Sequence, residues 1–275
     1  MISQATIGSV TFQAGSAYAL TGVPGLELPT VRLFSYDLPG EHFGIHTNAL
    51  YGRRAFALRG WVLGESVSDF ISKRDALIDA LDILGGEQVL AFTLANGLTK
   101  RITAIPRTLD FSPEAGIPAA APFSIAFEAA FPYLEGDEQS QSISLALAGG
   151  GKVPPDAMPA SLGKGSGGVV TITNGGNAPS YPTFRIQGPV TNPSIRNSSL
   201  NLELRFTLDL AAGAYLEIDT KRKTVTDQTG RNRYSTLTGD WFTLAPGSTN
   251  MQLLADSTDP DATLTVVWRP TYLNL

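Results

Sequence analysis

The chain has 275 residues, more than one domain usually contains, and its charged fraction of 16% is below the ~25% of a typical soluble domain. Its net charge of −5 argues against broad electrostatic attachment to nucleic acid or to an anionic membrane, since phosphate binding needs clustered Lys and Arg. The most apolar window, residues 115–131, is broken by Pro118, Pro122 and Glu128, which argues against insertion into a membrane. The absence of Cys excludes disulfides, thiolate metal sites and thiol nucleophiles, and fits folding in a reducing cytoplasm. We therefore expect a soluble, mainly β protein of two domains.

Residues 1–147 are predicted to form the first domain. Short runs of Val, Thr, Phe and Leu between Gly and Pro predict strands and turns over 5–13 and 28–36. Both faces of 31–36 are partly apolar, so we expect this strand to be covered on both sides. Residues 38–51 contain both histidines and little periodicity, which indicates a long loop or an extended arm.

A strand over 54–63 is expected next, with Phe56, Leu58 and Val62 on one face. It leads into a helix predicted over 67–84. Ser66 is a suitable N-cap and Asp69 suits the first turn. One apolar stripe is expected to lie on a sheet, and its members are Val67, Phe70, Ile71, Leu77, Ile78, Leu81 and Leu84.

The glycines 85 and 86 are expected to end this helix. Asp69 and Lys73 are expected to pair on its exposed side. A hairpin follows, with strands over 89–95 and 98–105 joined by Asn96-Gly97 as a two-residue type I′ turn. Further strands of the first domain are predicted at 120–131 and 141–147.

Residues 148–168 are rich in Gly and Pro and are predicted to be an inter-domain linker or long loop. Residues 169–275 are predicted to form a β-sandwich or jelly roll. Asn174-Gly175-Gly176 is expected to form a turn after its first strand. The predicted strands of this domain cover 169–173, 200–208, 216–218, 241–244, 251–254 and 262–268.

Catalytic and metal-binding patterns are sparse. His42 and His46 have the spacing of a helical zinc pair, but Gly44 lies between them and loop histidines are the simpler interpretation. No Gly-x-Ser-x-Gly elbow occurs, which argues against a Ser-His-Asp hydrolase. Glu135, Asp137 and Glu138 form a carboxylate group that would suit glycoside cleavage, or equally a solvated turn.

Three further groups have a functional and a structural interpretation. Asp256, Asp259 and Asp261 offer oxygen ligands for calcium, although Asp-Pro-Asp is common in plain turns. Lys221-Arg222-Lys223 is either an anion site or a hairpin turn. Aromatic side chains of the second domain would stack on sugars if exposed, or pack in the core if not, and these are Tyr215, Tyr234, Trp241 and Trp268.

The sequence resembles the distal tail proteins of long-tailed, siphovirus-type bacteriophages. The resemblance is carried mainly by residues 173–195, which begin Thr-Asn-Gly-Gly-Asn-Ala-Pro-Ser-Tyr-Pro. In the first domain, Gly52-Arg53-Arg54 and Leu58-Arg59-Gly60 before the helix are similar to the family's ring-forming domain. The sequence is also similar to this family at residues 215–220, Val225, 241–247 and 267–273.

The resemblance implies a structural virion protein without catalytic residues, metal or cofactor. It would form a homohexameric ring that joins the tail tube to the tail tip or baseplate, assembled in the host cytoplasm. The partners implied are the tail tube, tape-measure and tail-tip hub proteins. The second domain would be a galectin-like or carbohydrate-module-like sandwich that projects outward.

Two other functions stay open from the residues. A carbohydrate-binding adhesin would contact host-surface glycans through the aromatics of the second domain. A tail-borne depolymerase is a weaker alternative, because His and paired carboxylates are scarce. If DNA passes through a ring, the negative net charge permits a lumen that repels phosphate.

Overall fold

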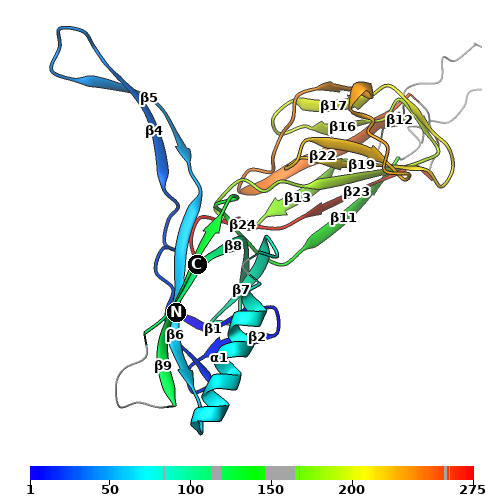
Figure 1. Ribbon diagram of the computed structural model, residues 1–275. Helices are drawn as coiled ribbons and strands as arrows, with labels where there is room; N and C mark the ends of the chain where they lie inside the picture. Colours follow the sequence, from blue (N-terminus) through cyan, green and yellow to red (C-terminus); the bar gives the residue numbers. More distant parts are fainter. Residues whose placement is uncertain (83, 113–118, 146–164, 167, 257–258, 260) are drawn as a thin grey trace, which may run out of the picture. The chain divides into compact units, whose positions relative to one another are not determined.

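The computed structural model describes residues 1–82, 84–112, 119–145, 165–166, 168–256, 259 and 261–275. The chain divides into two compact units, one of Met1–Gly136 with Tyr272–Leu275 and one of Asp137–Thr271 (Figure 1). The protein is mainly β with one α-helix in its described part, as predicted. Within the same described residues, none of the helical structure has the length and apolarity of a membrane span.

The first unit is built on an antiparallel sheet that curls around its own core. Phe12 and Tyr18, on the two edge strands, have ring centroids 5.8 Å apart, so the sheet is nearly closed. A short strand β10 (Leu134–Glu135) pairs with the long strand of this sheet. In spatial order the sheet contains β2 (Val10–Gln13), β1 (Ile2–Ile7), β7 (Gln88–Leu94), β8 (Thr99–Phe111), β9 (Ala120–Ala129), β6 (Arg54–Leu63) and β3 (Tyr18–Gly22).

Alternation along β6 and β9 explains how these strands supply the core. The predicted strand over 54–63 is confirmed, and it buries every second residue, including Phe56, Leu58 and Val62. On β9, Phe123 and Ile125 are buried in the same way, together with Phe127. The register pairs Phe56 with Phe127 and Leu58 with Ile125, so apolar side chains of both strands meet on one face.

The helix α1 (Val67–Leu81) begins as predicted but ends earlier. Ser66 accepts a hydrogen bond from the Asp69 N–H, which confirms the N-cap. Lys73 and Asp69 pair at 2.7 Å. The predicted end at 84 is wrong, because Asp82 already adopts a left-handed backbone (φ 31°) that stops the helix.

The single apolar stripe predicted for this helix is also wrong. Leu77 and Leu81 are fully buried against the sheet, and Phe70 packs beside them. Val67, Ile71, Ile78 and the following Leu84 instead face solvent. The helix therefore has a second apolar surface that its own unit does not cover.

The hairpin of β7 and β8 forms where the sequence predicts it, but its turn differs. The Gly97 N–H donates to the Leu94 carbonyl and the Leu94 N–H to the Leu98 carbonyl. Gly97 has a positive φ of 84° whereas Asn96 does not. The loop is thus three residues long with glycine in the left-handed position, rather than a two-residue type I′ turn.

The second unit is a sandwich of two antiparallel sheets. Side chains from both sheets form its core, including Phe184, Leu204 and Leu264. One sheet runs in the order β11 (Gln139–Ser144), β23 (Thr263–Trp268), β14 (Thr183–Gln187), β19 (Tyr215–Asp219) and β20 (Thr224–Asp227). The other runs β12 (Gly165–Ser166), β22 (Gly247–Ala255), β16 (Ser194–Asn197), β17 (Leu202–Phe206) and β21 (Leu237–Gly239), with β13 (Val170–Asn174) also on β22.

Short elements complete this unit: β15 (Val190–Thr191) pairs with β18 (Asp209–Leu210), and η1 (Tyr234–Thr236) is a single 3₁₀ turn. The short β24 (Thr271–Tyr272) is where the chain returns to the first unit. The predicted turn at Asn174 is confirmed, since its side chain accepts from the Gly176 N–H. A Cβ on Gly176 would lie 1.9 Å from the Thr271 carbonyl oxygen, so the position requires glycine.

Some sequence predictions for this region differ from the structure. The strand at 241–244 is absent, and only Leu244 makes an isolated bridge, to Ser180. Strand β11 pairs with β23 in the second unit, although the sequence assigned residues 141–147 to the first domain. Most of the predicted linker 148–168 lies outside the described residues, and Gly165–Ser166 within it pair with β22.

Candidate functional site

The most exposed apolar feature of the first unit is a long hairpin, which we call the arm. It consists of β4 (Val31–Asp37) and β5 (Gly44–Tyr51), which form a sheet of their own and project from the rest of the unit (Figure 1). The alternative of an extended arm over 38–51 is thus confirmed. Every residue of both strands is exposed, so the chain itself does not supply the expected cover on both sides of 31–36.

Both faces of the arm are apolar. The register pairs Val31 with Tyr51 and Leu33 with Ala49 on one face. On the other face the paired residues are Arg32 with Leu50, Phe34 with Asn48 and Tyr36 with Ile45. Leu33 is 59% exposed and Tyr36 52% exposed. A lone two-stranded hairpin is at best marginally stable in water, and exposed apolar surface of this kind is typical of interaction sites.

The base of the arm is held by specific hydrogen bonds. The Gly52 N–H donates to the Thr30 carbonyl at 2.7 Å, and the Thr30 hydroxyl donates to the Arg53 carbonyl at 2.8 Å. Arg53 is exposed and pairs with Glu128 on β9 at 2.8 Å. These contacts fix the point at which the arm leaves the sheet.

Directly after this point, Arg54 is completely buried. Its guanidinium donates to three backbone carbonyls, those of Pro132 (2.6 Å), Leu26 (2.8 Å) and Leu273 (2.6 Å). Burial lowers the pKa of Arg54, and the nearby Glu27 carboxylate partly opposes this effect. The residue ties the arm base to the last residues of the chain, which belong to the same unit.

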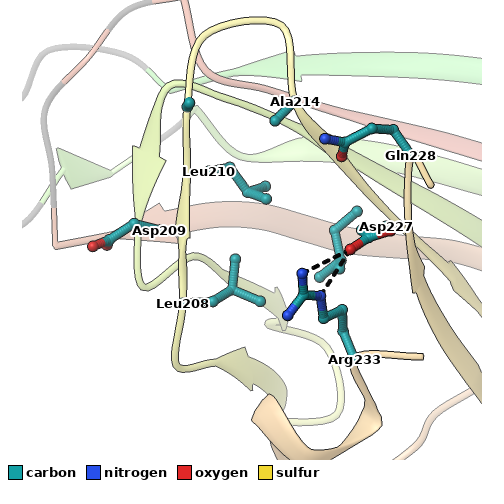
Figure 2. A pocket seen from close by; sticks show the side chains of 9 residues that line it. Leu208, Asp209, Leu210, Ala214, Asp227, Gln228 and Arg233 are labelled. Atoms are coloured by element: carbon teal, nitrogen blue, oxygen red, sulfur yellow. Dashed lines mark hydrogen bonds and ion pairs between the residues drawn. The ribbon is translucent and has the colours of Figure 1, made fainter. Parts of the chain in front are cut away.

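The second unit contains a half-open pocket of about 280 Å³. Leu208, Leu210 and Ala214 form one side of it, and Asp227 with Arg233 lies across from them (Figure 2). Asp209 points away from the pocket centre. An apolar wall that faces a few polar groups is the usual composition of a small-ligand site.

Asp227 organises the polar side of this pocket. Its carboxylate accepts from the Thr229 hydroxyl (2.6 Å), from the Arg231 N–H (3.1 Å) and from Arg233 Nε (2.8 Å). The Thr229 hydroxyl and the Arg233 guanidinium hold the pKa of Asp227 well below its usual value. The carboxylate therefore stays ionised, and the pocket presents a fixed ion pair.

The residues considered as possible metal ligands do not form a cluster in the described part of the chain. His42 lies in the turn of the arm and His46 on β5, both exposed. Asp256 pairs with Arg205 at 3.2 Å, whereas Asp259 accepts from the Asp261 N–H in a local turn. Across the residues that the structure describes, no group of three His or acidic side chains has a metal-binding arrangement.

The other charged candidates have local structural contacts. Glu138 pairs with Arg269 at 3.0 Å, and Glu135 lies on β10. Lys221-Arg222-Lys223 forms the turn between β19 and β20, where the Asp219 carboxylate accepts the N–H groups of Lys221 and Arg222. The hairpin interpretation of this basic run is confirmed.

The four aromatic candidates of the second unit differ in exposure. Trp268 is buried and its indole N–H donates to the Thr173 carbonyl. Trp241 packs against the core and stacks on Tyr234, which is 48% exposed. Arg185 lies over the ring of Tyr215, 4.4 Å from its centroid. Core packing is therefore confirmed for Trp241 and Trp268, and Tyr234 offers an exposed ring.

Sequence reasoning missed two features: the buried Arg54 and the pocket with Asp227 and Arg233. The first carries a signal, since Arg54 falls in phase with the buried Phe56 and Leu58 on β6. The pocket has only a weak signal in the sequence, because Asp227 and Arg233 are six residues apart and only the turn between them brings them together.

Comparisons with known proteins identify the fold. Residues 175–272 match the model of the siphovirus-type tail component, C-terminal domain. The chain is similar to the crystal structure of the SPP1 Dit (gp 19.1) protein, with a TM-score of 0.68 at 14% identity over 98% of this chain and 99% of that one. That protein is described as a paradigm of the hub adsorption apparatus in phages that infect Gram-positive bacteria.

A second similar structure is a chain of the phage p2 baseplate in its activated conformation with Ca, with a TM-score of 0.51 at 12% identity over 97% of this chain and 98% of that one. A comparison with curated protein sequences gives no match. The family match defines the class of the second unit: residues 175–272 are similar to the C-terminal domain of siphovirus-type tail components. The whole chain has the fold of a distal tail (Dit) protein, in agreement with the sequence resemblance.

Proposed function

We propose that the protein is the distal tail hub, a homohexameric ring that joins the tail tube to the tail tip or baseplate in the virion. The observation that carries this proposal is the arm, whose two apolar faces are both exposed in the single chain. Burial of apolar side chains stabilises association by about 25 cal/mol per Å² of buried apolar surface. A ring of copies gives each arm a neighbour to pack on.

The arm favours a head-to-tail contact over a two-fold one. It projects from one end of β6, and the helix α1 follows the other end of that strand, so the two ends of the unit carry different surfaces. Heterologous contacts between different surfaces generate closed rings when the rotation closes. The similarity in fold to a hub protein and to a baseplate chain supports the same assembly.

The proposed partners follow from a position between tube and tip. They are the tail tube protein, the tape-measure protein and the tail-tip hub protein, and the ring would assemble in the host cytoplasm before it enters the tail. In this role the chain contributes surfaces and no catalysis. The dispersed carboxylates support this, since Glu138 pairs with Arg269 and Asp256 with Arg205.

The test is native mass spectrometry of the full chain at micromolar concentration, with negative-stain microscopy of the same sample. We expect a species of six times the 29.1 kDa chain mass and annular particles. A strict monomer at this concentration would overturn the ring.

A second candidate function is glycan binding by the second unit, as in a galectin-like or carbohydrate-module-like domain. The pocket favours it, because the apolar wall and the Asp227–Arg233 pair suit a small polar ligand with an apolar face. The test is binding to an array of bacterial surface glycans. Ala214→Trp should fill the pocket and abolish binding, whereas Leu200→Trp, outside the pocket lining, should not. Equal binding by both variants, or none by the unaltered chain, would reject this candidate.

A further inference from the structure

The helix α1 presents an apolar stripe to solvent, next to the side that makes its buried contacts. Val67 is 50% exposed, Ile71 42% and Ile78 44%. Spacings of four and seven residues return to the same side of a helix, so these side chains form one surface. The buried side, with Leu77 and Leu81, already satisfies the core of the unit. The exposed stripe is therefore available for a contact outside the chain.

Acidic side chains flank this stripe. Asp75, Asp79 and Asp82 are exposed on the same side of the helix as Ile71 and Ile78. The segment 65–87 contains six carboxylates and two basic residues, a net charge of −4 out of −5 for the chain. Such a surface selects a partner that is apolar and locally basic.

One face of the arm has this composition. It is formed by the exposed Phe34, Tyr36, Ile45 and Leu50, and Arg32 is the charged residue among them. The acidic Asp37 falls on the opposite face, with Leu33 and Ser35, because side chains alternate along the strand. The face of the arm that contains Phe34 is thus complementary to α1 in both apolar character and charge.

Resting on the ring assembly proposed above, we infer that the Arg32–Phe34–Tyr36 face of the arm of one copy packs along the Val67–Ile71–Ile78 stripe of α1 in the next copy. The lengths of the strand β4 and the helix α1 agree. The seven residues of β4 span roughly 23 Å, and the fifteen residues of α1 span roughly 22 Å.

The contact has to be between copies. The arm leaves the sheet at the Arg54 end of β6, and α1 begins beyond the Leu63 end. These ten residues separate the two ends by roughly 33 Å, and the arm projects away from the helix (Figure 1). Each copy therefore offers an arm to one neighbour and a helix to the other, which is the arrangement of a closed ring. Arg32 then lies near Asp75 and Asp79 of the next copy.

Cross-linking tests this contact directly, because the chain contains no Cys. The full-length double variant Asn48→Cys/Ser72→Cys places one thiol on the Phe34 face of the arm and one beside Ile71 on the helix. Both positions are exposed and polar, so the apolar contacts stay intact. With a short thiol-reactive cross-linker we expect a denaturing gel to show a ladder of two to six chains. The control Asn48→Cys/Leu200→Cys should give no such ladder.

Charge reversal gives a second readout that does not depend on the register of the thiols. Arg32→Asp should weaken hexamer formation roughly tenfold. Asp75→Arg with Asp79→Arg in the same chain should restore it.

Native mass spectrometry of each variant separates two failures. A hexamer that gives neither ladder nor response to charge reversal would overturn this contact and leave the ring intact. The absence of a hexamer in the unaltered chain would overturn the ring, and this inference with it.

Discussion

The arm and the sandwich of the second unit contain the same kinds of residue with opposite burial. Leu204 and Phe206 on β17 are completely buried, whereas Leu33 and Phe34 on β4 are 59% and 48% exposed. Both pairs lie on antiparallel strands with well-formed partner strands. Strand pairing satisfies the backbone in both regions, but only the sandwich has a second layer that covers the side chains.

This difference in burial follows from how apolar residues are distributed over the two faces of each strand. Strand β17 alternates apolar and polar residues, which suits a half-buried sheet that needs one cover. Strand β4 has apolar residues on both faces and needs two covers. The single chain provides neither, so the apolar surface of the arm is available for assembly.

Among the changes proposed here, removal of the arm should have the largest effect on assembly. Replacement of residues 31–51 by Gly-Ser-Gly should abolish the ring, because it removes the apolar surface that a neighbour covers. Both cores should remain, since no arm residue contributes to either. Native mass spectrometry should show only monomer, with a circular dichroism spectrum that is still dominated by β-structure. Persistence of the hexamer would contradict the role of the arm.

Truncation of one phenylalanine in each region should separate folding from assembly. Phe184→Ala empties a fully buried site and should lower the free energy of unfolding by about 3–5 kcal/mol. Phe34→Ala should change the free energy of unfolding of the monomer by less than about 0.5 kcal/mol, yet weaken the hexamer. Urea unfolding followed by tryptophan fluorescence measures the first effect and native mass spectrometry the second. Equal destabilisation by both substitutions would mean that the arm folds against its own chain.

Adjacent arginines at the arm base provide a matched pair. Arg54→Met leaves one buried and two part-buried carbonyls without their donor and should cost about 3 kcal/mol. Arg53→Met removes an exposed pair with Glu128 and should cost less than about 1 kcal/mol. Thermal and urea unfolding of the two variants decide between them. A similar loss in the free energy of unfolding for both variants would show that the Arg54 contacts do not hold the arm base.

The smallest effect is expected at the pocket of the second unit. Asp227→Asn should lower the Tm at pH 7, because the ionised carboxylate is held by Thr229 and Arg233. Since the pKa of Asp227 is depressed in the folded protein, this stabilisation is complete above the unfolded pKa of about 3.9 and is lost as the pH falls below it. The Tm difference should therefore shrink in acid. Asp209→Asn serves as the control and should leave the Tm unchanged. If the Tm difference caused by Asp227→Asn did not depend on pH, the charge of the Asp227 carboxylate would not be its cause.

The sequence predicts those elements whose signals are local. The N-cap at Ser66, the strand 54–63 and the turn at Asn174 each depend on neighbouring residues, and the structure confirms them. The predictions that fail depend on tertiary context. Residues 241–244 have a strand-like pattern, but only Leu244 finds a backbone bridge.

The candidate sites divide in the same way. An extended arm is one of two alternatives that the sequence gives for residues 38–51, because they show little periodicity, whereas the two apolar faces of 31–36 predict a strand with cover on both sides. The outward stripe on α1 is not predicted, because its residues and the buried ones form one broad apolar arc, and the sequence does not show which part of that arc the sheet covers. Ile71, at one edge of the arc, faces solvent, whereas Leu77, at the other, is buried. The pocket with Asp227 and Arg233 requires knowledge of how the turn folds.

The most direct test of the central claim is the mass of the full-length protein in solution, compared with that of the chain from which the arm has been removed. The account predicts a species of six times 29.1 kDa for the full chain and a monomer for the armless one. A full chain that stays monomeric at micromolar concentration, or an armless chain that still forms the hexamer, would contradict it.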